Sequence, residues 1–298
     1  MTILTRNFAL FLILVLSLQG CVESSDKEAK KGDEAITETK DEPSGTNVVN
    51  VGNTLFSIPS PVQTAILIES SGADYDASLA NSPQNLSNYV SDFDKGLIMG
   101  VYGADLAYTS IFEMNQEAIT YLGAVEELAN DLDLANAIDQ SIIKRFSKNL
   151  SHRDSMLALS STFFRESDLY LKENDRDADA ALVLVGGWVE GMYLAYNSVE
   201  GNADVRQRIA EQKVTLDNII GLLKSLESTE QLDEMIGELG DLKSAFDEVK
   251  ATYEYQRPEV KPKEKLTILK STTDFEMTEE QLDAIGTQLE SIRNNIVG

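Results

Sequence analysis

The chain has 298 residues, and its 50 acidic side chains outnumber 25 lysines and arginines, which gives a net charge of −25. Nucleic-acid binding needs clustered lysine and arginine against phosphates, so this balance predicts that nucleic acid is not a partner. A single cysteine and a single histidine exclude an internal disulfide framework and multi-histidine metal sites. The sequence therefore predicts no cofactor and no metal.

The first twenty residues have the pattern of an export signal. Arg6 supplies a positive charge, residues 8–18 are almost continuously apolar, and the small Gly20 precedes Cys21. An apolar helix of this length rises about 16 Å, which is too short for a hydrocarbon core of about 30 Å. We therefore expect residues 1–20 to be a signal peptide.

The residues Leu18-Gln19-Gly20-Cys21 resemble the lipobox of bacterial lipoproteins. The resemblance implies that Cys21 receives a diacylglyceryl thioether, that the chain is cleaved before Cys21, and that its new amino terminus is then acylated. Two or more acyl chains hold a protein stably at a membrane, whereas one holds it only marginally. The expected localisation is the cell envelope, at the outer membrane, on either its periplasmic or its outer face.

The composition of residues 21–54 predicts an acidic, disordered tether. They are rich in Glu, Asp, Lys, Ser and Thr and poor in large apolar residues. Such a segment cannot bury enough surface to offset the entropy of ordering it. As a flexible coil it would span about 30 Å.

From residue 55 onward the sequence predicts an all-α fold. Ser60, Ser82 and Ser91 stand where helix caps are expected, and the first two precede prolines. Helices are expected at 61–71, directly after 82, and at 92–114, 116–130, 134–150, 153–174 and 177–199. Together they predict a helical bundle over residues 55–200.

Residues 201–298 have narrower apolar stripes, which favour a long antiparallel, coiled-coil-like hairpin followed by a C-terminal helix. The first helix is expected at 203–227, and the second carries a stripe from Leu232 to Tyr253. The last helix follows Thr278, with Gln281 completing a capping box. Residues 265–270 are the one strand-like segment. This region either stands apart or packs with 55–200 as one body.

Two segments, 93–112 and 180–196, are apolar almost all round and should lie at the centre of the fold. Both contain glycines, which weaken a helix by about 0.5–1 kcal/mol each relative to alanine. Close approach of the two helix backbones would explain them, and a bound ligand in place of the missing side chains is the alternative. The glycines are 96, 100, 103, 186, 187 and 191.

Each central segment also carries one carboxylate, Asp105 or Glu190. A buried carboxylate must be paired, hydrogen-bonded or protonated. A structural tie to a tyrosine hydroxyl or to an arginine such as Arg145 or Arg165 is one interpretation. The other is a pocket for a cationic or hydroxylated ligand, lined by Asp105, Glu190, Tyr102 and Tyr193, with Tyr108 and Tyr196 nearby. No nucleophile or oxyanion loop accompanies them, so no catalytic residue is assigned.

The remaining candidates for metal binding are weak. His152 is the only histidine, at the expected start of a helix. Asp175, Asp177 and Asp179 reproduce the first half of a calcium loop, but position 180 is alanine instead of glycine and position 186 is glycine instead of glutamate. We expect these aspartates to cap the next helix and to complement its dipole.

The mature chain as a whole is similar to all-helical lipoproteins of bacterial envelopes. The function expected first is that of a lipid-anchored binding or assembly component, with an envelope protein partner bound through residues 203–256. The alternative is a small-ligand-binding lipoprotein with its pocket between helices 93–112 and 180–196. A hydrolase is the third possibility.

Overall fold

The structure is a computed structural model, and it describes residues 46–298 with several gaps. The gaps are 52–53, 135–143, 146–147, 150–154, 156–157, 160–161, 163–169, 171–172, 175, 199, 201 and 263–265. Cys21, His152, Arg165 and Asp175 lie outside the described residues, and so does most of the two helices expected at 134–150 and 153–174.

The fold is mainly helical, which confirms the predicted all-α class. Residues 42–298 form one compact unit, so the helices before and after residue 200 belong to the same body. The helices are α1 (Pro61–Ser70), a 3₁₀ helix η1 (Pro83–Asn88), α2 (Asp92–Ile111), α3 (Asn115–Asp131), α6 (Asp177–Asn197), α7 (Ala203–Lys224), α8 (Glu230–Asp247) and α9 (Glu279–Val297).

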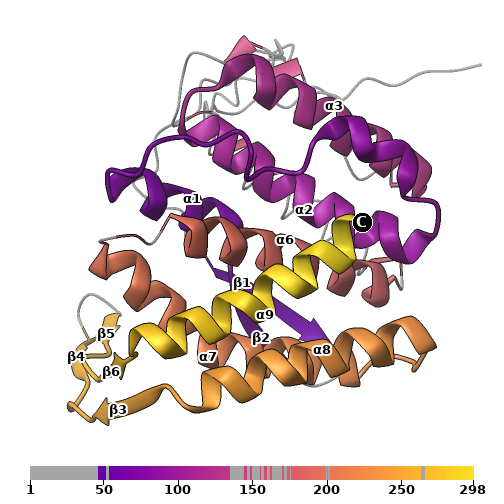
Figure 1. Cartoon of the computed structure of the whole chain (residues 1–298). Helices are drawn as coiled ribbons and strands as arrows, with labels where there is room; N and C mark the ends of the chain where they lie inside the picture. The colour runs from indigo at the N-terminus through magenta and orange to yellow at the C-terminus, as the bar shows by residue number, and fades with distance from the viewer. Residues whose placement is uncertain are drawn as a thin grey trace, which may run out of the picture. The chain divides into compact units, whose positions relative to one another are not determined.

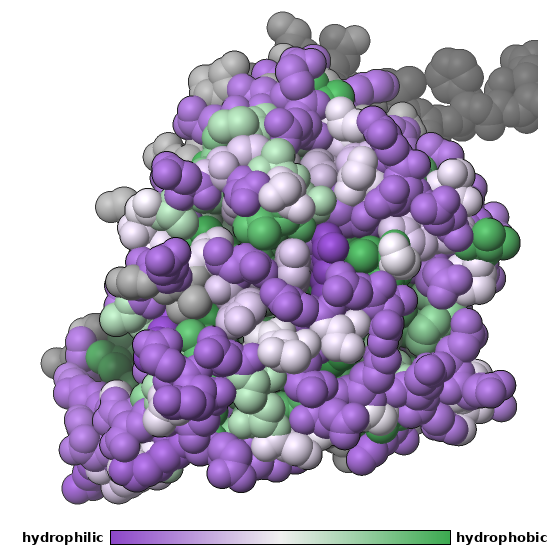
Figure 2. Space-filling view, viewed as in Figure 1, coloured by the Kyte–Doolittle hydropathy of each residue, from purple (hydrophilic) through white to green (hydrophobic). Residues whose placement is uncertain are grey.

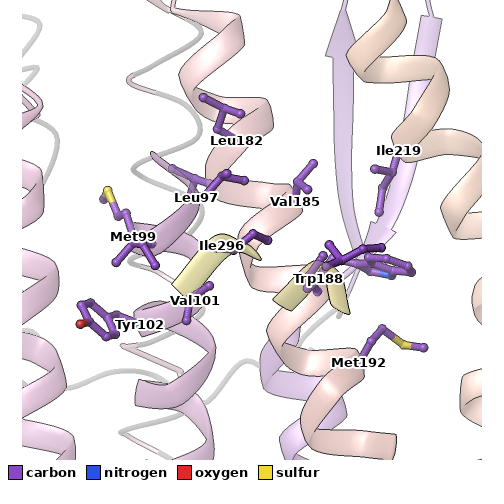
Figure 3. Packing of buried hydrophobic residues seen from close by; sticks show 14 of the residues in the cluster. Leu97, Met99, Val101, Tyr102, Leu182, Val185, Trp188, Met192, Ile219 and Ile296 are labelled. Carbon is purple, nitrogen blue, oxygen red and sulfur yellow. The ribbon is translucent and has the colours of Figure 1, made fainter. Parts of the chain in front are cut away.

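Helices α2 and α6 form the most extensive contact between two elements, and the others pack around this pair (Figure 1). On one side α3 and α1 contact α2, and α1 also contacts α6. On the other side α7 and α9 contact α6, and α8 packs on both α7 and α9. The two apolar segments, 93–112 and 180–196, therefore lie at the centre of the fold as expected. Figure 3 shows side chains from both segments together with those of Ile219 and Ile296.

Local capping sets the starts of several helices where the sequence predicts them. The side chains of Ser60, Ser82 and Ser91 accept hydrogen bonds from the first turns of α1, η1 and α2. Thr278 and Gln281 form the expected capping box at the start of α9. Because a cap needs only neighbouring backbone N–H groups, it can be recognised in the sequence.

The narrow stripes of α7 and α8 are buried inside the fold. Leu216, Ile219, Leu223, Leu239 and Leu242 have no exposed surface. Helix α9 packs along α8 and α6, and α7 packs against α6 and α8. The seam expected to offer a partner surface is thus part of the core.

The expected helix through Tyr253 is wrong at its C-terminal end, because α8 stops at Asp247. Residues Lys250–Glu254 form strand β3, which pairs antiparallel with β6 (Thr272–Glu276). Strand β4 (Glu259–Lys261) pairs with β5 (Leu266–Ile268), which lies in the predicted strand at 265–270. An apolar residue every third or fourth position continues through Val249 and Tyr253, so the stripe alone could not show where the helix ends.

A further antiparallel pair precedes α1. Strand β1 (Thr46–Val51) pairs with β2 (Thr54–Pro59), and β2 contacts α7. Strand β1 lies within the range expected as tether, so ordered structure begins earlier than the predicted boundary at residue 54.

Within the described part of the chain, α6 is the one helix long and apolar enough to cross a membrane. Its most apolar window is 78% buried, and both of its long faces are packed against other helices. These are properties of a core helix in a bundle.

Candidate functional site

Glycines bring the backbones of α2 and α6 into direct contact. A Cβ added at Gly100 would lie 2.0 Å from the carbonyl oxygen of Val183, and one added at Gly186 would lie 1.9 Å from that of Leu97. Gly187 packs beside Gly100 and against Pro61 of α1. Close approach, the first of the two explanations, therefore accounts for these glycines. The space left by their missing side chains is filled by protein backbone.

This close contact brings Asp105 of α2 and Glu190 of α6 together in the core. Both residues have no exposed surface. The Nε and Nη2 atoms of Arg293, on α9, donate to the two carboxylate oxygens of Glu190 at 3.1 and 3.2 Å. This two-pronged geometry is the strongest form of an arginine–carboxylate pair. We call Asp105, Glu190 and Arg293 the buried charge cluster.

Arg293 has two more partners that fix its position. Its Nη2 atom donates to the backbone oxygen of Leu79 at 3.1 Å. Its guanidinium lies over the ring of Tyr193, 4.6 Å from the ring centroid, a geometry that favours a cation. The side chain of Arg293 is 12% exposed, so the cation is largely withdrawn from water.

Asp105 has fewer partners than Glu190. The backbone N–H of Asn81 donates to its Oδ2 atom at 3.1 Å, and its buried Oδ1 atom accepts no hydrogen bond from the described residues. Burial and the adjacent Glu190 carboxylate raise the pKa of Asp105 well above its usual range. A protonated Asp105 can donate a hydrogen bond to Glu190, and this gives its otherwise unpartnered oxygen a role.

Glu190 keeps the negative charge of the pair. Burial raises its pKa, while the Arg293 guanidinium and the hydrogen bond from Asp105 act in the opposite direction. Because Arg293 touches Glu190 on both oxygens, the shared proton belongs on Asp105. The cluster is thus one cation, one anion and one neutral acid.

The tyrosines expected around the carboxylates have separate roles. Tyr102 donates to the backbone oxygen of Ser82 at 3.0 Å, and Tyr108 accepts from the backbone N–H of Asp76 at 3.0 Å. Tyr193 stacks on Arg293, and the ring of Tyr196 fills the position where a Cβ of Gly286 would lie. Only Tyr193 contacts the charge cluster in these interactions.

Sequence reasoning missed two members of this site. The arginine that pairs with the carboxylates is Arg293, whereas Arg145 is exposed. The second is Asn81, whose backbone N–H donates to Asp105. The side chain of Asn81 also donates to the hydroxyl of Tyr89, which in turn donates to the backbone oxygen of Val297. A signal for Arg293 was present, since it lies between Leu289 and Ile296 on the edge of the apolar stripe of α9.

Of the residues considered for metal binding, His152 and Asp175 lie outside the described residues, whereas Asp177 and Asp179 are described. Among the described residues, no group of three or more acidic, histidine or cysteine side chains is arranged to hold a metal. Asp177 and Asp179 lie in the first turn of α6, as expected, but the N-cap residue is Arg176, which pairs with Asp179 at 2.7 Å. Trp188 is buried, and its Nε1 atom donates to Gln212 at 3.1 Å.

Within the described part of the chain, neither carboxylate of the cluster has any exposed surface. A surface depression lined by Leu67, Asp204, Gln207, Arg208 and Glu211 contains none of the cluster residues. Figure 2 shows a face dominated by hydrophilic side chains, with apolar atoms in small separate patches. The buried charge cluster is therefore suited to holding α2, α6 and α9 together.

No protein-family model, curated protein or solved structure matches this chain.

Proposed function

We propose that this chain is a lipid-anchored protein of the bacterial cell envelope, held at the outer membrane through Cys21, that acts as a binding or assembly component through its surface. The observation that favours a binding role over a catalytic one is the burial of the two carboxylates in the charge cluster. Asp105 and Glu190 have no exposed surface, so they meet no substrate unless the core opens. The residues Leu18, Gly20 and Cys21 support the anchor.

The position of the exposed apolar side chains supports a surface role as well. Of the eight large hydrophobic residues that are exposed in the described part of the chain, five lie between residues 253 and 269. The stripes of α7 and α8 are buried, so a partner of residues 203–256 would contact the exposed side of α7 at Val214, and Tyr253 and Tyr255 in and directly after strand β3.

The anchor is tested by metabolic labelling with an alkyne fatty acid in a bacterial host that processes lipoproteins. The wild-type chain should take up the label and fractionate with outer membranes. The Cys21→Ser chain should be unlabelled. An unmodified Cys21 in a soluble wild-type protein would overturn the proposal. If the wild type is labelled, protease treatment of intact cells reports which face of the membrane its body occupies.

A small-ligand site is the second candidate, and the partnerless Oδ1 atom of Asp105 is the observation in its favour. The backbone contacts at Gly100 and Gly186 oppose it, because they fill the space between the two helices. Native mass spectrometry of the purified protein distinguishes the two. A retained adduct that is lost in both Asp105→Asn and Glu190→Gln, with the fold intact, would favour the ligand site over a purely structural cluster.

A further inference from the structure

Residues Lys250–Glu276, which we call the arm, connect α8 to α9, and their described part, 250–262 and 266–276, contains two antiparallel strand pairs. Strand β3 pairs with β6, and farther out β4 pairs with β5. Between the two paired regions the first strand has four residues, 255–258, and the second has three, 269–271. The extra residue is a bulge, and the Ser271 hydroxyl bridges it by bonding both the N–H and the carbonyl oxygen of Gln256.

The two sides of the arm differ sharply in charge. Successive residues of the second strand point to opposite sides, and residues paired across the ribbon share a side. One side carries Ala251, Tyr253, Val260, Thr267, Thr273 and Phe275, none of them charged. Residues 269–271 lie between the two pairings, and the ion pair of Lys270 with Glu259 places Lys270 on the opposite side. Alternation along the strand then places Leu269 and Ser271 on the same side as Thr267. The opposite side carries Lys250, Glu254, Glu259, Lys261, Lys270, Asp274 and Glu276, together with Thr252, Leu266, Ile268 and Thr272. We call these the uncharged side and the charged side.

The uncharged side is covered only at its base. Phe275 packs against the core next to α7. Farther out, Tyr253, Val260 and Leu269 are 63%, 62% and 77% exposed. The charged side is held by ion pairs, Lys250 with Glu276 at 2.9 Å and Lys270 with Glu259 at 2.6 Å. A two-stranded ribbon is marginal in water by itself, so a cover over its apolar side would stabilise it.

Charge selects the kind of surface that can cover the arm. The arm contains six basic and five acidic residues, a net charge of +1, whereas the whole chain has −25. Its outer half, residues 257–270, has five basic and two acidic residues. An anionic surface repels the acidic body and attracts this outer half. Lys261 and Lys270 lie on the opposite side of the ribbon from Val260, but the ribbon is only about 10 Å thick, which is about one Debye length at moderate salt. The surface would therefore meet the arm first.

The size of the uncharged side argues against a protein partner. Strands of about a dozen residues make a ribbon about 40 Å long and about 10 Å wide, a face of about 400 Å². A stable protein interface needs about 800 Å² from each partner. A membrane contact requires less area when the acylated Cys21 already holds the chain there, because the anchor keeps the arm at a high effective concentration near the surface. Tyrosine also favours the headgroup region of a bilayer.

We propose that the outer part of the uncharged side, with Tyr253, Val260 and Leu269, lies on the anionic phospholipid surface at which the chain is anchored. This inference rests on the proposed lipid anchor for its geometry. The arm then orients the acidic body, because it is the segment that contacts the membrane while the body stays in water.

The test uses the full lipidated chain with one introduced cysteine carrying an environment-sensitive fluorophore. Acylation of Cys21 leaves the new cysteine as the one free thiol. Thr267→Cys places the label on the uncharged side, and Thr272→Cys is the matched control on the charged side. In phosphatidylcholine vesicles containing phosphatidylglycerol, the Thr267→Cys label should shift to the blue and be quenched by lipid-borne nitroxide, while the control label should remain water-like.

Two outcomes would overturn the proposal. Labels that behave alike on both sides would show that the uncharged side does not select lipid. A shift at Thr267→Cys that grows with protein density and resists the lipid-borne quencher would show that a second copy covers this side.

A second pair of variants removes the apolar side chains themselves. Val260→Ser with Leu269→Ser should abolish the blue shift, and Leu266→Ser with Ile268→Ser, on the charged side, should leave it. Retention of the shift in the first pair would contradict the proposal. Val260, Leu269 and Leu266 are exposed and Ile268 is half-buried, and circular dichroism checks that the helices persist in both double variants.

Failure of the anchor is seen separately. The mass of the mature wild-type protein reports whether Cys21 is acylated. The labelled variants in the Cys21→Ser chain, added to the same vesicles, report whether the arm contacts lipid without acylation. An unacylated Cys21 with a lipid-sensitive arm would refute the proposed anchor and support lipid contact by the arm. An acylated Cys21 with a water-like arm would support the anchor and refute the lipid contact.

Discussion

Arg293 is 103 residues from Glu190 along the chain, yet its guanidinium is the cation that neutralises the Glu190 carboxylate. The carboxylate is fully buried, so it cannot exchange this partner for water. Removing one member of a buried ion pair leaves a charge without compensation, which is far more damaging than losing an exposed pair. The contribution of each residue in this cluster therefore depends on the other two.

Arg293→Met should destabilise the protein by about 3–5 kcal/mol, because it keeps most of the side-chain stem and removes the charge opposite Glu190. Urea unfolding followed by circular dichroism measures the change. Arg206→Met is the control, since Arg206 pairs with Glu279 at the surface and such pairs contribute about 0–1 kcal/mol. Equal losses in the two variants would contradict the structural role of Arg293.

Asp105 gives the protein a characteristic pH dependence. Its pKa is raised in the folded state, so above the unfolded value of about 3.9 the folded protein holds a proton that the unfolded chain has released. The stabilising contribution is complete below that value. It decreases as the pH rises, by about 1.4 kcal/mol per pH unit, until the folded pKa is passed.

Asp105→Asn should remove this dependence, because asparagine stays neutral and its amide can still donate to Glu190. Relative to the wild type, the variant should therefore become more stable with each step of pH above about 4. Urea unfolding at a series of pH values checks this. Parallel stability curves for the two proteins would mean that Asp105 is ionised in the folded state.

Among the contacts between helices, the core depends most on the one between α2 and α6. Gly100 and Gly186 lie where the two backbones touch. Other glycines of the chain, such as Gly237 on α8, have no atom within 4 Å of an added Cβ. Substituting glycine by alanine is therefore expected to have opposite effects on stability at these two kinds of position.

Gly100→Ala and Gly186→Ala should each destabilise the fold by at least about 1–3 kcal/mol, because the new methyl group pushes the helices apart. Gly237→Ala should instead stabilise α8 by about 0.5–1 kcal/mol, since alanine restricts the unfolded chain and favours the helix. Thermal and urea unfolding of the three variants provide the comparison. A mild effect at Gly100 would mean that the helices can separate freely.

Helix beginnings were predictable in this chain, and some helix ends were not. Ser60, Ser91 and Thr278 cap their helices through atoms only a few residues away, so the sequence carries the whole interaction. The end of α8 is different. The stripe of apolar residues runs on through Val249 and Tyr253, and pairing with residues 272–276, far along the chain, makes this segment a strand.

The molecule as a whole is held by its last helix, whereas the arm extends beyond the core. Helix α9 contacts α2, α6 and α8 and supplies Arg293. The arm contributes Phe275 to the edge of the core, and its strands are otherwise largely exposed. Loss of these two parts should therefore have unequal effects.

A chain that stops before residue 279 should fail to fold cooperatively, because Glu190 loses its cation and the stripes of α8 are uncovered. Replacing residues 252–274 by a short glycine-containing turn should preserve the helical content and a single unfolding transition. Circular dichroism and urea titration of the two shortened chains test the contrast. A cooperative fold without α9 would show that the bundle is complete before the last helix.

The sequence by itself determined the helical class, the cap positions, the two central segments and the burial of Asp105 and Glu190, because these follow from local spacing and from the free energy of burying each residue type. Only the tertiary structure decided that Arg293 pairs with Glu190, that glycines 100 and 186 are filled by backbone, and that residues 250–276 form an arm with one uncharged side. Each of these depends on residues distant in the chain meeting in space, and no local pattern specifies which distant residue arrives.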